Sequence, residues 1–428
     1  MTKIDLSWLE SFRTDQPHFG LERMETLLAL RGKPHQTLPV IHIAGTNGKG
    51  STIAHLRQLL QALGLTVGVF SSPYLIDYRD QLTINGKPIP EQNLADLFAS
   101  YRPLLLEHQA ELLGLTEFEI ITAMSFDYFH QQEVDIAIME VGMGGLLDST
   151  NVCQPLLTAI TTIGLDHVAL LGDTLEKIAE QKAGIIKENI PVVLGNIAPQ
   201  AVQVITDIAE QKTAPLWHYQ DDYKVIPQAS LAHGETFRYQ SKLREETQLI
   251  TPLIGGQQVE NAGLALALAD LYCQLQGLPL LTAVQVQDAL KQVSWPGRME
   301  ILSQDPLILI DGAHNPHAME RLVTNLNQRY PDQPKQILFT CINTKEELTM
   351  IRQLKTVKNA DITLTSFADS RAIPAETMQK LATTENLAYC DWQAFLKKAK
   401  TSRDMLVVTG SLYFLAQVRP TLLEQETL

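Results

Sequence analysis

The strongest chemical signal in the sequence is a glycine-rich segment, GTNGKGS, at residues 45–51. An apolar run at 38–44 leads into it, and apolar residues at helical spacing follow it, as in a loop between a strand and a helix. Backbone N–H groups of such a loop surround phosphate oxygens, and the N-terminus of the following helix adds partial positive charge. The pattern predicts a phosphate site formed by Gly45, Thr46, Asn47, Gly48, Lys49, Gly50 and Ser51.

Within this segment, Lys49 would reach the β- and γ-phosphates of a nucleotide, and Ser51 could ligate Mg²⁺. The common string GxxxxGK[ST] is not matched literally, because Gly50 separates Lys49 from Ser51. A plain glycine-rich turn between a strand and a helix is the alternative, but the lysine and the flanking pattern favour phosphate binding.

Two further side chains stand at the ends of apolar runs. Glu140 closes the run at 135–141, and a carboxylate at the C-terminal end of a parallel strand lies on the ligand side of the sheet. It could provide an oxygen ligand for Mg²⁺, with an edge carboxylate in solvent as the alternative. His167 follows the run at 157–163 and is compatible with metal or phosphate contact, although an isolated histidine is more often structural.

Lys182 occupies an unusual place on a predicted helix. The apolar stripe of this segment includes Leu175 and Ile178, and Lys182 lies seven and four residues after them, so it falls on the same stripe. The helical pattern alone favours a lysine that snorkels to the surface. If it is buried instead, its pKa falls, and the neutral amine can react with CO₂ to give a carbamate, an anionic oxygen ligand for Mg²⁺.

The ends of the same segment carry ordinary helix signals. Asp173 and Glu176 resemble a capping box, with Asp173 in the place of the usual serine or threonine. Lys177 and Lys187 lie off the apolar stripe, and we expect both to be solvated.

The elements that must position these residues alternate between short apolar runs and amphipathic stretches, which indicates a parallel sheet covered on both faces. The alternation restarts after a Trp-Pro-Gly turn near 294–297, which marks a domain boundary. The fold class is therefore α/β, with a P-loop-containing parallel-sheet domain at 1–294 and a smaller Rossmann-like α/β domain at 295–428. Residues 217–253 are more polar and strand-like, and we expect a β-excursion at the edge of the first domain.

Composition narrows the class of protein. The 428 residues are 45% hydrophobic and 19% charged, which suits large cores rather than disorder. The net charge is −14, and this excess lies entirely in residues 1–294, which argues against nucleic acid or an anionic membrane as a partner. Four cysteines without paired spacing, no apolar run of membrane length and no signal-peptide core at the start predict a cytoplasmic protein.

Taken in order, seven segments carry a family resemblance. They are GTNGKGS (45–51), SSPYL (71–75), EVGMGGLLDSTN (140–151), TTIGLDHVALLGDTLEKIAEQKAGIIK (161–187), GGQQVENA (255–262), WPGRME (295–300) and DGAHNP (311–316). Over about residues 17–415 the chain resembles the folylpolyglutamate synthase/dihydrofolate synthase family of Mur-type ATP-dependent amide ligases.

The resemblance implies a reaction and its small-molecule substrates. ATP would phosphorylate a carboxylate of a folate or dihydropteroate, and the amine of L-glutamate would attack the acyl phosphate to form an amide. It further implies two Mg²⁺ sites, a site between the two domains and a chain that works as a monomer.

Roles carry over by matching position. In the first domain, the resemblance assigns Lys49 and Ser51 to the phosphates and the first Mg²⁺, with Ser72, Glu140 and His167 completing the metal sites. Lys182 matches the lysine that is carbamylated in the family and would be a further metal ligand.

Four more residues would bind ATP. Asn261 would face the adenine end, Arg298 the phosphates and Asp311 the ribose side. His314 would lie near the phosphate or the incoming glutamate, and it joins Lys49, His167 and Lys182 as a candidate catalytic residue.

The chain departs from the usual family pattern at several positions. The family commonly has His at Tyr74, Glu-Arg at 80–81, Arg at Leu146 and His at Gln257. The acceptor is therefore open: a folate with one or several glutamates, dihydropteroate, or another carboxylate handled by a Mur-type paralogue. A nucleotide-binding regulator without ligase activity is the alternative from another class, and the intact metal-site residues argue against it.

Overall fold

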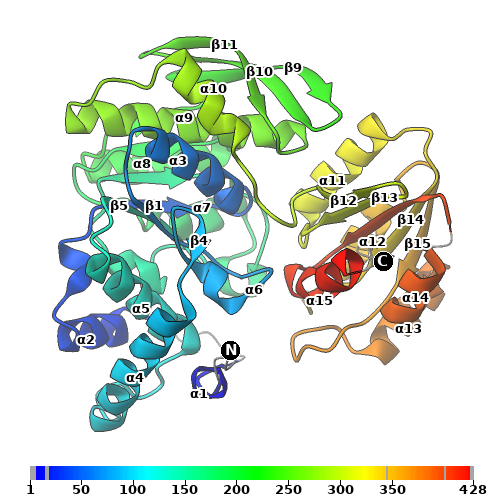
Figure 1. Cartoon of the computed structure of the whole chain (residues 1–428), viewed down its shortest axis with the longest axis horizontal. Coiled ribbons are helices and arrows are strands. Elements are labelled where there is room, and N and C mark those ends of the chain that lie inside the picture. Colours follow the sequence, from blue (N-terminus) through cyan, green and yellow to red (C-terminus); the bar gives the residue numbers. More distant parts are fainter. Residues whose placement is uncertain (1–5, 15–18, 344–345, 400–401, 425–428) are drawn as a thin grey trace.

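A computed structural model describes residues 6–14, 19–343, 346–399 and 402–424. In Figure 1 the chain forms two bodies, joined by one linker after helix α10 and built around separate sheets. The predicted two-domain α/β architecture is confirmed. The expected boundary near 294–297 falls between helix α10 and strand β12.

The first sheet has eight strands and is mostly parallel. Its order is β4 (Lys87–Pro88), β3 (Leu82–Ile84), β2 (Val67–Phe70), β5 (Ile136–Glu140), β1 (Val40–Ala44), β6 (Leu157–Ile160), β7 (Val192–Leu194) and β8 (Leu216–Trp217). At one edge, β3 pairs with both β2 and β4 in the antiparallel sense. The glycine-rich loop follows β1 and Glu140 ends β5, and these two strands are neighbours in register.

Helices cover both faces of this sheet because its central strands are apolar on both sides. One face packs against α3 (Lys49–Ala62), α9 (Gly256–Gln276) and α10 (Ala283–Lys291). The other packs against two groups of helices, which are α1 (Ser7–Glu10), α2 (Glu22–Leu30), α4 (Glu91–Glu107) and α5 (Glu117–Gln131) at one end, and α6 (Val168–Leu171), α7 (Leu175–Ala183) and α8 (Pro199–Gln211) at the other. Short 3₁₀ turns are η1 (Pro34–Gln36), η2 (Tyr78–Gln81) and η3 (Ser149–Val152).

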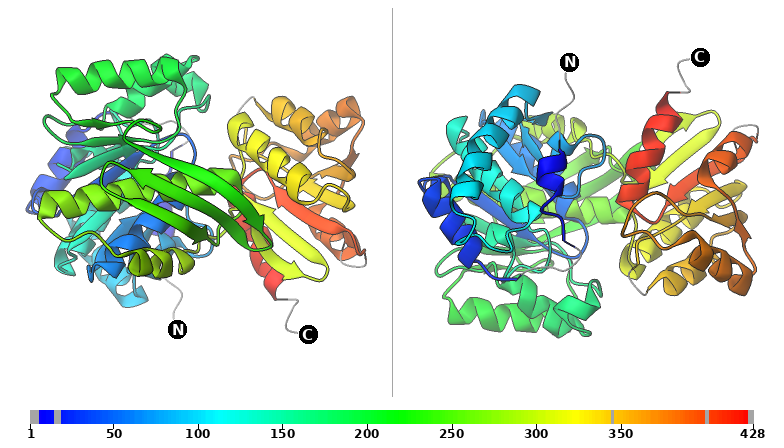
Figure 2. Two further views of the ribbon diagram at one scale, coloured as in Figure 1. Left: turned by 90° about the horizontal axis from the view of Figure 1, so that it is seen from above. Right: turned by 90° about the horizontal axis from the view of Figure 1, so that it is seen from below.

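The expected β-excursion is a three-stranded antiparallel sheet. Its strands are β9 (Tyr223–Leu231), β10 (Gly234–Ser241) and β11 (Glu245–Thr251), with β10 in the middle. One end packs on α9 through buried aromatic side chains, whereas the turn between β9 and β10 extends toward the second domain, as the left view of Figure 2 shows.

The second domain is a six-stranded sheet between two groups of helices. The strand order is β12 (Glu300–Gln304), β13 (Leu307–Asp311), β17 (Met405–Thr409), β14 (Lys335–Phe339), β15 (Ala360–Leu364) and β16 (Ala388–Tyr389), and only β12 is antiparallel. One face carries α11 (Pro316–Arg329), α12 (Glu347–Leu354) and α13 (Ala375–Glu385), and the other carries α14 (Trp392–Ala399) and α15 (Leu412–Leu423).

None of the helices in the described ranges combines the length and apolarity needed to cross a membrane.

Candidate active site

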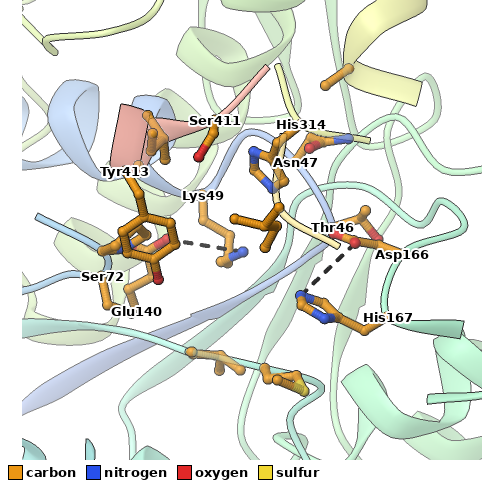
Figure 3. A pocket seen from close by; sticks show the side chains of 18 of the residues that line it. Thr46, Asn47, Lys49, Ser72, Glu140, Asp166, His167, His314, Ser411 and Tyr413 are labelled. Atoms are coloured by element: carbon orange, nitrogen blue, oxygen red, sulfur yellow. Dashed lines mark ion pairs between the residues drawn. The ribbon is translucent and has the colours of Figure 1, made fainter. Parts of the chain in front are cut away.

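A cleft of about 1240 Å³ lies between the two domains. The carboxyl ends of the central strands of both sheets open into it, which is where ligands bind in sheets of this kind. Every residue assigned to the site from sequence lines this cleft: Gly45, Thr46, Asn47, Gly48, Lys49, Gly50, Ser51, Ser72, Glu140, His167, Lys182, Asn261, Arg298, Asp311 and His314. Figure 3 shows several of them at close range.

The glycine-rich loop is held by the segment that follows the neighbouring strand β6. The backbone N–H of Thr46 donates to the carbonyl of Thr162 at 2.8 Å, and the N–H of Asn47 donates to the Thr162 hydroxyl at 3.0 Å. The Thr161 hydroxyl donates to the carbonyl of Asn47 at 2.6 Å. These contacts fix the peptide orientation of the loop before any phosphate binds, so little ordering remains to be done on binding.

Two glycines of the loop make room for other elements. Gly48 has a left-handed backbone (φ 89°), and a Cβ there would lie 2.5 Å from Oδ1 of Asn261 on α9. A Cβ at Gly50 would lie 2.7 Å from the ring of Trp295 in the linker between the domains. The glycine that interrupts the common P-loop string is therefore the one against which the linker packs.

Glu140 lies at the head of the cleft, close to the lysine of the loop. Its carboxylate is 5% exposed, and Oε1 is 4.0 Å from Nζ of Lys49 (Figure 3). Burial raises the pKa of Glu140 to about 7, although Lys49, Arg298 and a backbone hydrogen bond from Ser72 partly offset this. A bound cation would stabilise the charged form of a buried carboxylate whose pKa is raised in this way.

Lys182 is buried, not snorkelling as the helical pattern favoured. It is 4% exposed on α7, and burial, with repulsion from Lys49, lowers the pKa of its amine to about 7. Asp166 and Asp148 act in the opposite direction. The uncharged amine is therefore well populated near neutral pH, which is the form that can react with CO₂.

The ends of α7 differ from the sequence prediction. Thr174 is the N-cap, and its side chain accepts from the backbone N–H of Lys177 at 3.3 Å, so the expected Asp173 capping box is wrong. Asp173 instead pairs with Lys177 at 2.8 Å in solvent, one turn along the chain. Lys187 is not simply solvated, because its amine donates to the carbonyl of Asn151 at 3.0 Å in a partly buried position.

His167 lies on the far side of the glycine-rich loop from Glu140. It has a left-handed backbone (φ 49°) at the start of α6, and its Nε2 is 3.8 Å from Oδ1 of Asp166 (Figure 3). The other oxygen of Asp166 accepts a hydrogen bond from Asn315 of the second domain at 3.1 Å. Within the part of the chain that is described, no three His, Cys, Asp or Glu side chains converge, so any cation here would also need hydroxyl or ligand oxygens.

The second-domain wall follows strand β13. Both oxygens of buried Asp311 accept backbone hydrogen bonds, from Met299 at 2.9 Å and from Ala313 at 2.8 Å. His314 bonds through Nδ1 to the carbonyl of Gly312 at 2.8 Å, and burial lowers its pKa. The ring can therefore face the cleft uncharged, with Nε2 available to a ligand.

Sequence reasoning missed two cleft residues that follow strand β17. Ser411 and Tyr413 line the cleft across from Lys49, as Figure 3 shows. The signal was available, because β17 is an apolar run that ends at the same edge of the sheet as Asp311. The rule that located Glu140 and Asp311 would have located them as well.

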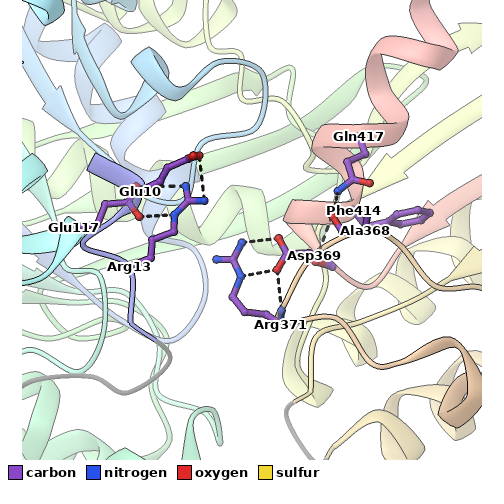
Figure 4. Close-up of polar contacts among 9 residues, drawn as sticks. Glu10, Arg13, Glu117, Ala368, Asp369, Arg371, Phe414 and Gln417 are labelled. Atoms are coloured by element: carbon purple, nitrogen blue, oxygen red, sulfur yellow. Dashed lines mark hydrogen bonds and ion pairs between the residues drawn. The ribbon is translucent and has the colours of Figure 1, made fainter. Parts of the chain in front are cut away.

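The mouth of the cleft carries charged side chains from both domains (Figure 4). In the first domain, Arg13 bonds to Glu117 at 2.5 Å and pairs with Glu10 at 3.2 Å. In the second, Arg371 bonds to Asp369 at 2.6 and 2.8 Å, and its guanidinium stacks 3.6 Å from the centre of the Tyr413 ring. Neither arginine belongs to a recognisable motif, so only the fold places them together.

The positions that depart from the family pattern fall into two groups. Tyr74, Gln81 and Gln257 line the cleft. Leu146 does not appear among the cleft residues and is 41% exposed. Its backbone N–H donates to the carbonyl of Gln181, so its loop packs on the helix of Lys182. The departures at the cleft are therefore the ones placed where a ligand in the cleft could contact them.

Comparisons with known proteins agree with this geometry. Residues 43–269 match the Mur ligase middle domain, and residues 297–412 match the Mur ligase, glutamate ligase domain. The dihydrofolate synthase/folylpolyglutamate synthase of Bacillus subtilis is 37% identical over 409 residues, covering 94% of this chain and 95% of that protein. The folylpolyglutamate synthase of Lacticaseibacillus casei is 37% identical over 408 residues, covering 94% of both.

Solved structures show the same arrangement. A folylpolyglutamate synthase complex with AMPPCP and folate superposes with a TM-score of 0.87 at 34% identity, covering 98% of both chains. The Mycobacterium tuberculosis folylpolyglutamate synthase complexed with ADP gives a TM-score of 0.89 at 27% identity, covering 97% of both.

One wall of the cleft carries a phosphate loop and a buried carboxylate, and a second α/β domain faces it. With the two matched domains, this arrangement defines an ATP-dependent ligase of the Mur type. Within that class, the chain belongs to the folylpolyglutamate synthase/dihydrofolate synthase family.

Proposed function

We propose that this protein adds L-glutamate to a folate acceptor through an acyl-phosphate intermediate formed with ATP. The observation that carries the proposal is the convergence of Lys49, Glu140 and Lys182 at the head of a cleft between two domains, in a chain of this family. The relatives are named for glutamate addition to folates, and one solved neighbour holds AMPPCP and folate together.

ATP phosphates would occupy the loop at 45–51, where backbone N–H groups and the start of α3 face the cleft. Lys49 from the first domain and Arg298 from the second would approach the transferred phosphoryl group from the two walls. Both charges would offset the negative charge of the bound phosphates, and Lys49, beside Glu140, would also offset the charge that gathers in the transition state. Asn261, which contacts the loop at Gly48, and Asp311 would orient the nucleoside end.

The residues present fit Mg²⁺. Ser51, Ser72 and Glu140 offer hard oxygen donors beside the phosphate loop, and Glu140 is a buried carboxylate that a cation would stabilise. His167 and Lys182 would belong to a second site. When bound, Mg²⁺ neutralises phosphate charge and polarises the phosphoryl group for attack.

We propose that Lys182 is carbamylated. Its low exposure and lowered pKa favour the neutral amine, and adding CO₂ releases one proton and turns a buried base into an anion. That anion would supply metal-ligand oxygens on the same first-domain wall as Glu140.

The reaction then proceeds in two steps. The acceptor carboxylate attacks the γ-phosphorus of ATP, the bond to the β-phosphate oxygen breaks, and ADP leaves. The uncharged amine of L-glutamate attacks the acyl carbon, phosphate leaves, and the amine loses a proton as the amide forms. Closure of the cleft around the substrates would exclude water, which would otherwise hydrolyse the acyl phosphate.

The mouth of the cleft suits an acceptor that carries carboxylates. Arg13 and Arg371 come from opposite domains and both line the cleft there. Each arginine already pairs with an acidic side chain of its own domain. A carboxylate of an extended acceptor would therefore bind by replacing that acidic side chain as the partner of the arginine. Since both walls come from one chain, we propose a monomer with small-molecule partners only, and its cytoplasmic location stays a prediction.

The test is ADP and phosphate release measured with ATP, L-glutamate and, in turn, pteroate, folate and diglutamyl folate. Release that requires both glutamate and one of these acceptors supports the proposal. Nucleotide binding without such release would favour a regulator, and release with an unrelated carboxylate would favour a paralogue with another acceptor.

A further inference from the structure

Helix α11 of the second domain carries a row of polar side chains at intervals of four residues. They are His317, Arg321, Asn325 and Arg329. Residues four apart form one ridge on a helix surface. The buried apolar residues of α11 lie elsewhere on it, in the core of the second domain. Each of the four polar side chains instead reaches across to the first domain.

The contacts of this row run from the phosphate loop outward. Nδ1 of His317 is 3.0 Å from the side-chain nitrogen of Asn47 in the loop. Nη2 of Arg321 is 4.0 Å from Glu260 on α9. Asn325 donates to the side-chain oxygen of Gln257, in the first turn of α9, at 3.0 Å.

The last member of the row makes the most extensive contact. Arg329 lies 3.3 Å from Oε1 of Glu235, and it donates to the carbonyls of Leu231 at 2.5 Å and Gly234 at 3.3 Å, in the turn between β9 and β10. Its side chain is 9% exposed and that of Glu235 is 6% exposed. This is the turn that reaches toward the second domain in Figure 2.

Glu235 links this contact to the nucleotide side of the cleft. Its Oε1 also accepts the backbone N–H of Gly255 at 2.7 Å, and Gly255 is the N-cap of α9. Its Oε2 accepts the hydroxyl of Ser230 at 2.7 Å. One buried carboxylate therefore joins the second domain, the β-turn and the start of the helix that places Asn261 against Gly48.

We infer that Arg329 and Glu235 are positioning residues for the nucleotide. They hold the second domain in register with the first turn of α9, so that the two walls of the cleft present their ATP-binding groups at a fixed separation. Neither residue lines the cleft, so they act through Gln257, Asn261 and the second-domain wall rather than by touching ATP. The inference rests on the proposed ATP site.

The experiment compares four variants with the wild type. Arg329→Gln removes the charge of one partner and leaves the buried Glu235 carboxylate without its cationic partner, which can destabilise the fold. Arg329→Gln with Glu235→Gln removes both charges and keeps the folded state testable. Arg238→Gln is the matched control, because Arg238 lies on β10 of the same sheet and pairs with Glu245 at 2.6 Å on an exposed surface.

The readouts are the Kd for AMPPCP by titration calorimetry, the KM for ATP and the melting temperature. We expect the double variant to bind AMPPCP roughly fivefold or more weakly, the lower range of coupling between linked sites, with a matching rise in KM for ATP. The control should stay within twofold of the wild type. Arg329→Lys keeps the positive charge but loses the planar guanidinium that bonds to several acceptors at once. It should therefore recover part of the affinity.

A double variant that melts at a lower temperature but binds AMPPCP as the wild type does would overturn the inference, because the pair would then be merely structural. An equal loss of affinity in Arg238→Gln would also overturn it. If the wild type itself fails to bind AMPPCP, the proposed function fails instead, and the two failures are thus told apart.

Discussion

The two walls of the cleft hold their charged groups in different ways. On the first-domain wall, burial raises the pKa of Glu140 and lowers that of Lys182, each to about 7, so both are poised between charged and neutral forms. On the second-domain wall, both oxygens of Asp311 and one ring nitrogen of His314 are already bonded to nearby backbone groups.

This difference separates two tasks. A buried charge that lacks enough opposite charge around it is stabilised when a charged ligand binds beside it. Residues that take part directly in the chemistry are expected to have such shifted pKa values. Groups fixed by their own backbone present a preset surface, as expected of residues that orient a substrate. We therefore expect changes on the first wall to lower kcat, and changes on the second wall to raise the KM for ATP.

The largest expected effect is that of Lys182→Ala. Loss of the carbamate should lower kcat by roughly 10³-fold, the scale of removing one preorganised electrostatic group. Acetate or formate should restore part of the activity by occupying the space of the missing anion. The matched control is Lys177→Ala on the same helix, where the lysine is exposed and pairs with Asp173. Normal turnover by Lys182→Ala would show that this lysine is not a metal ligand.

The next effect is on stability against pH in the protein without ligands. The pKa of Lys182 is about 7 in the folded protein and has its ordinary value of 10.5 in the unfolded chain. Between pH 7 and 10.5 the unfolded chain therefore binds more protons than the folded protein. Stability should therefore rise with pH from about 7 to 10.5, by on the order of 5 kcal/mol from this residue. In urea titrations, the advantage of Lys182→Met over the wild type should be largest at pH 7 and shrink toward pH 10. A difference that stays constant with pH would mean that the amine is not buried.

Arg298→Ala tests the second wall. The guanidinium lies against the carbonyl of Gly312 at 3.5 Å and faces the cleft, so its loss should weaken ATP binding rather than disturb the fold. We expect the KM for ATP to rise about 30-fold, the size of a lost charge-assisted hydrogen bond, with a smaller change in kcat. Arg352→Ala, which removes an exposed arginine that pairs with Glu385 outside the cleft lining, is the control. A fall in kcat alone would place Arg298 with the first-wall residues.

Much of this site was visible in the sequence because the chemistry sits at the ends of apolar strands. The glycine-rich loop, Glu140 and Asp311 each follow a strand pattern, and parallel strands bring their carboxyl ends to one edge. Residues placed by long-range packing were not visible in that way. Arg13 and Arg371 both lie at the mouth of the cleft only because the two domains face each other. The loop that packs on α7 covers the helix that carries Lys182.

The caps show the same limit on a smaller scale. Asp173 and Thr174 are both good N-cap residues, and the choice between them depends on where the chain leaves the preceding turn at Gly172. The local sequence predicts that a helix starts here. It does not predict which of the two adjacent residues is the N-cap, because that depends on tertiary contacts of the preceding turn.

The smallest expected effects compare two departures from the family pattern. Gln81 lines the cleft and is 6% exposed, whereas Leu146 lies outside the cleft lining and is 41% exposed. Gln81→Arg should lower the KM for diglutamyl folate by roughly threefold, as for a partly exposed ion pair, provided that the folded yield is unchanged. Leu146→Arg should change it by less than about twofold, since a solvated arginine gains little there. Equal effects at the two positions would mean that the acceptor extends beyond the cleft onto the loop above Lys182.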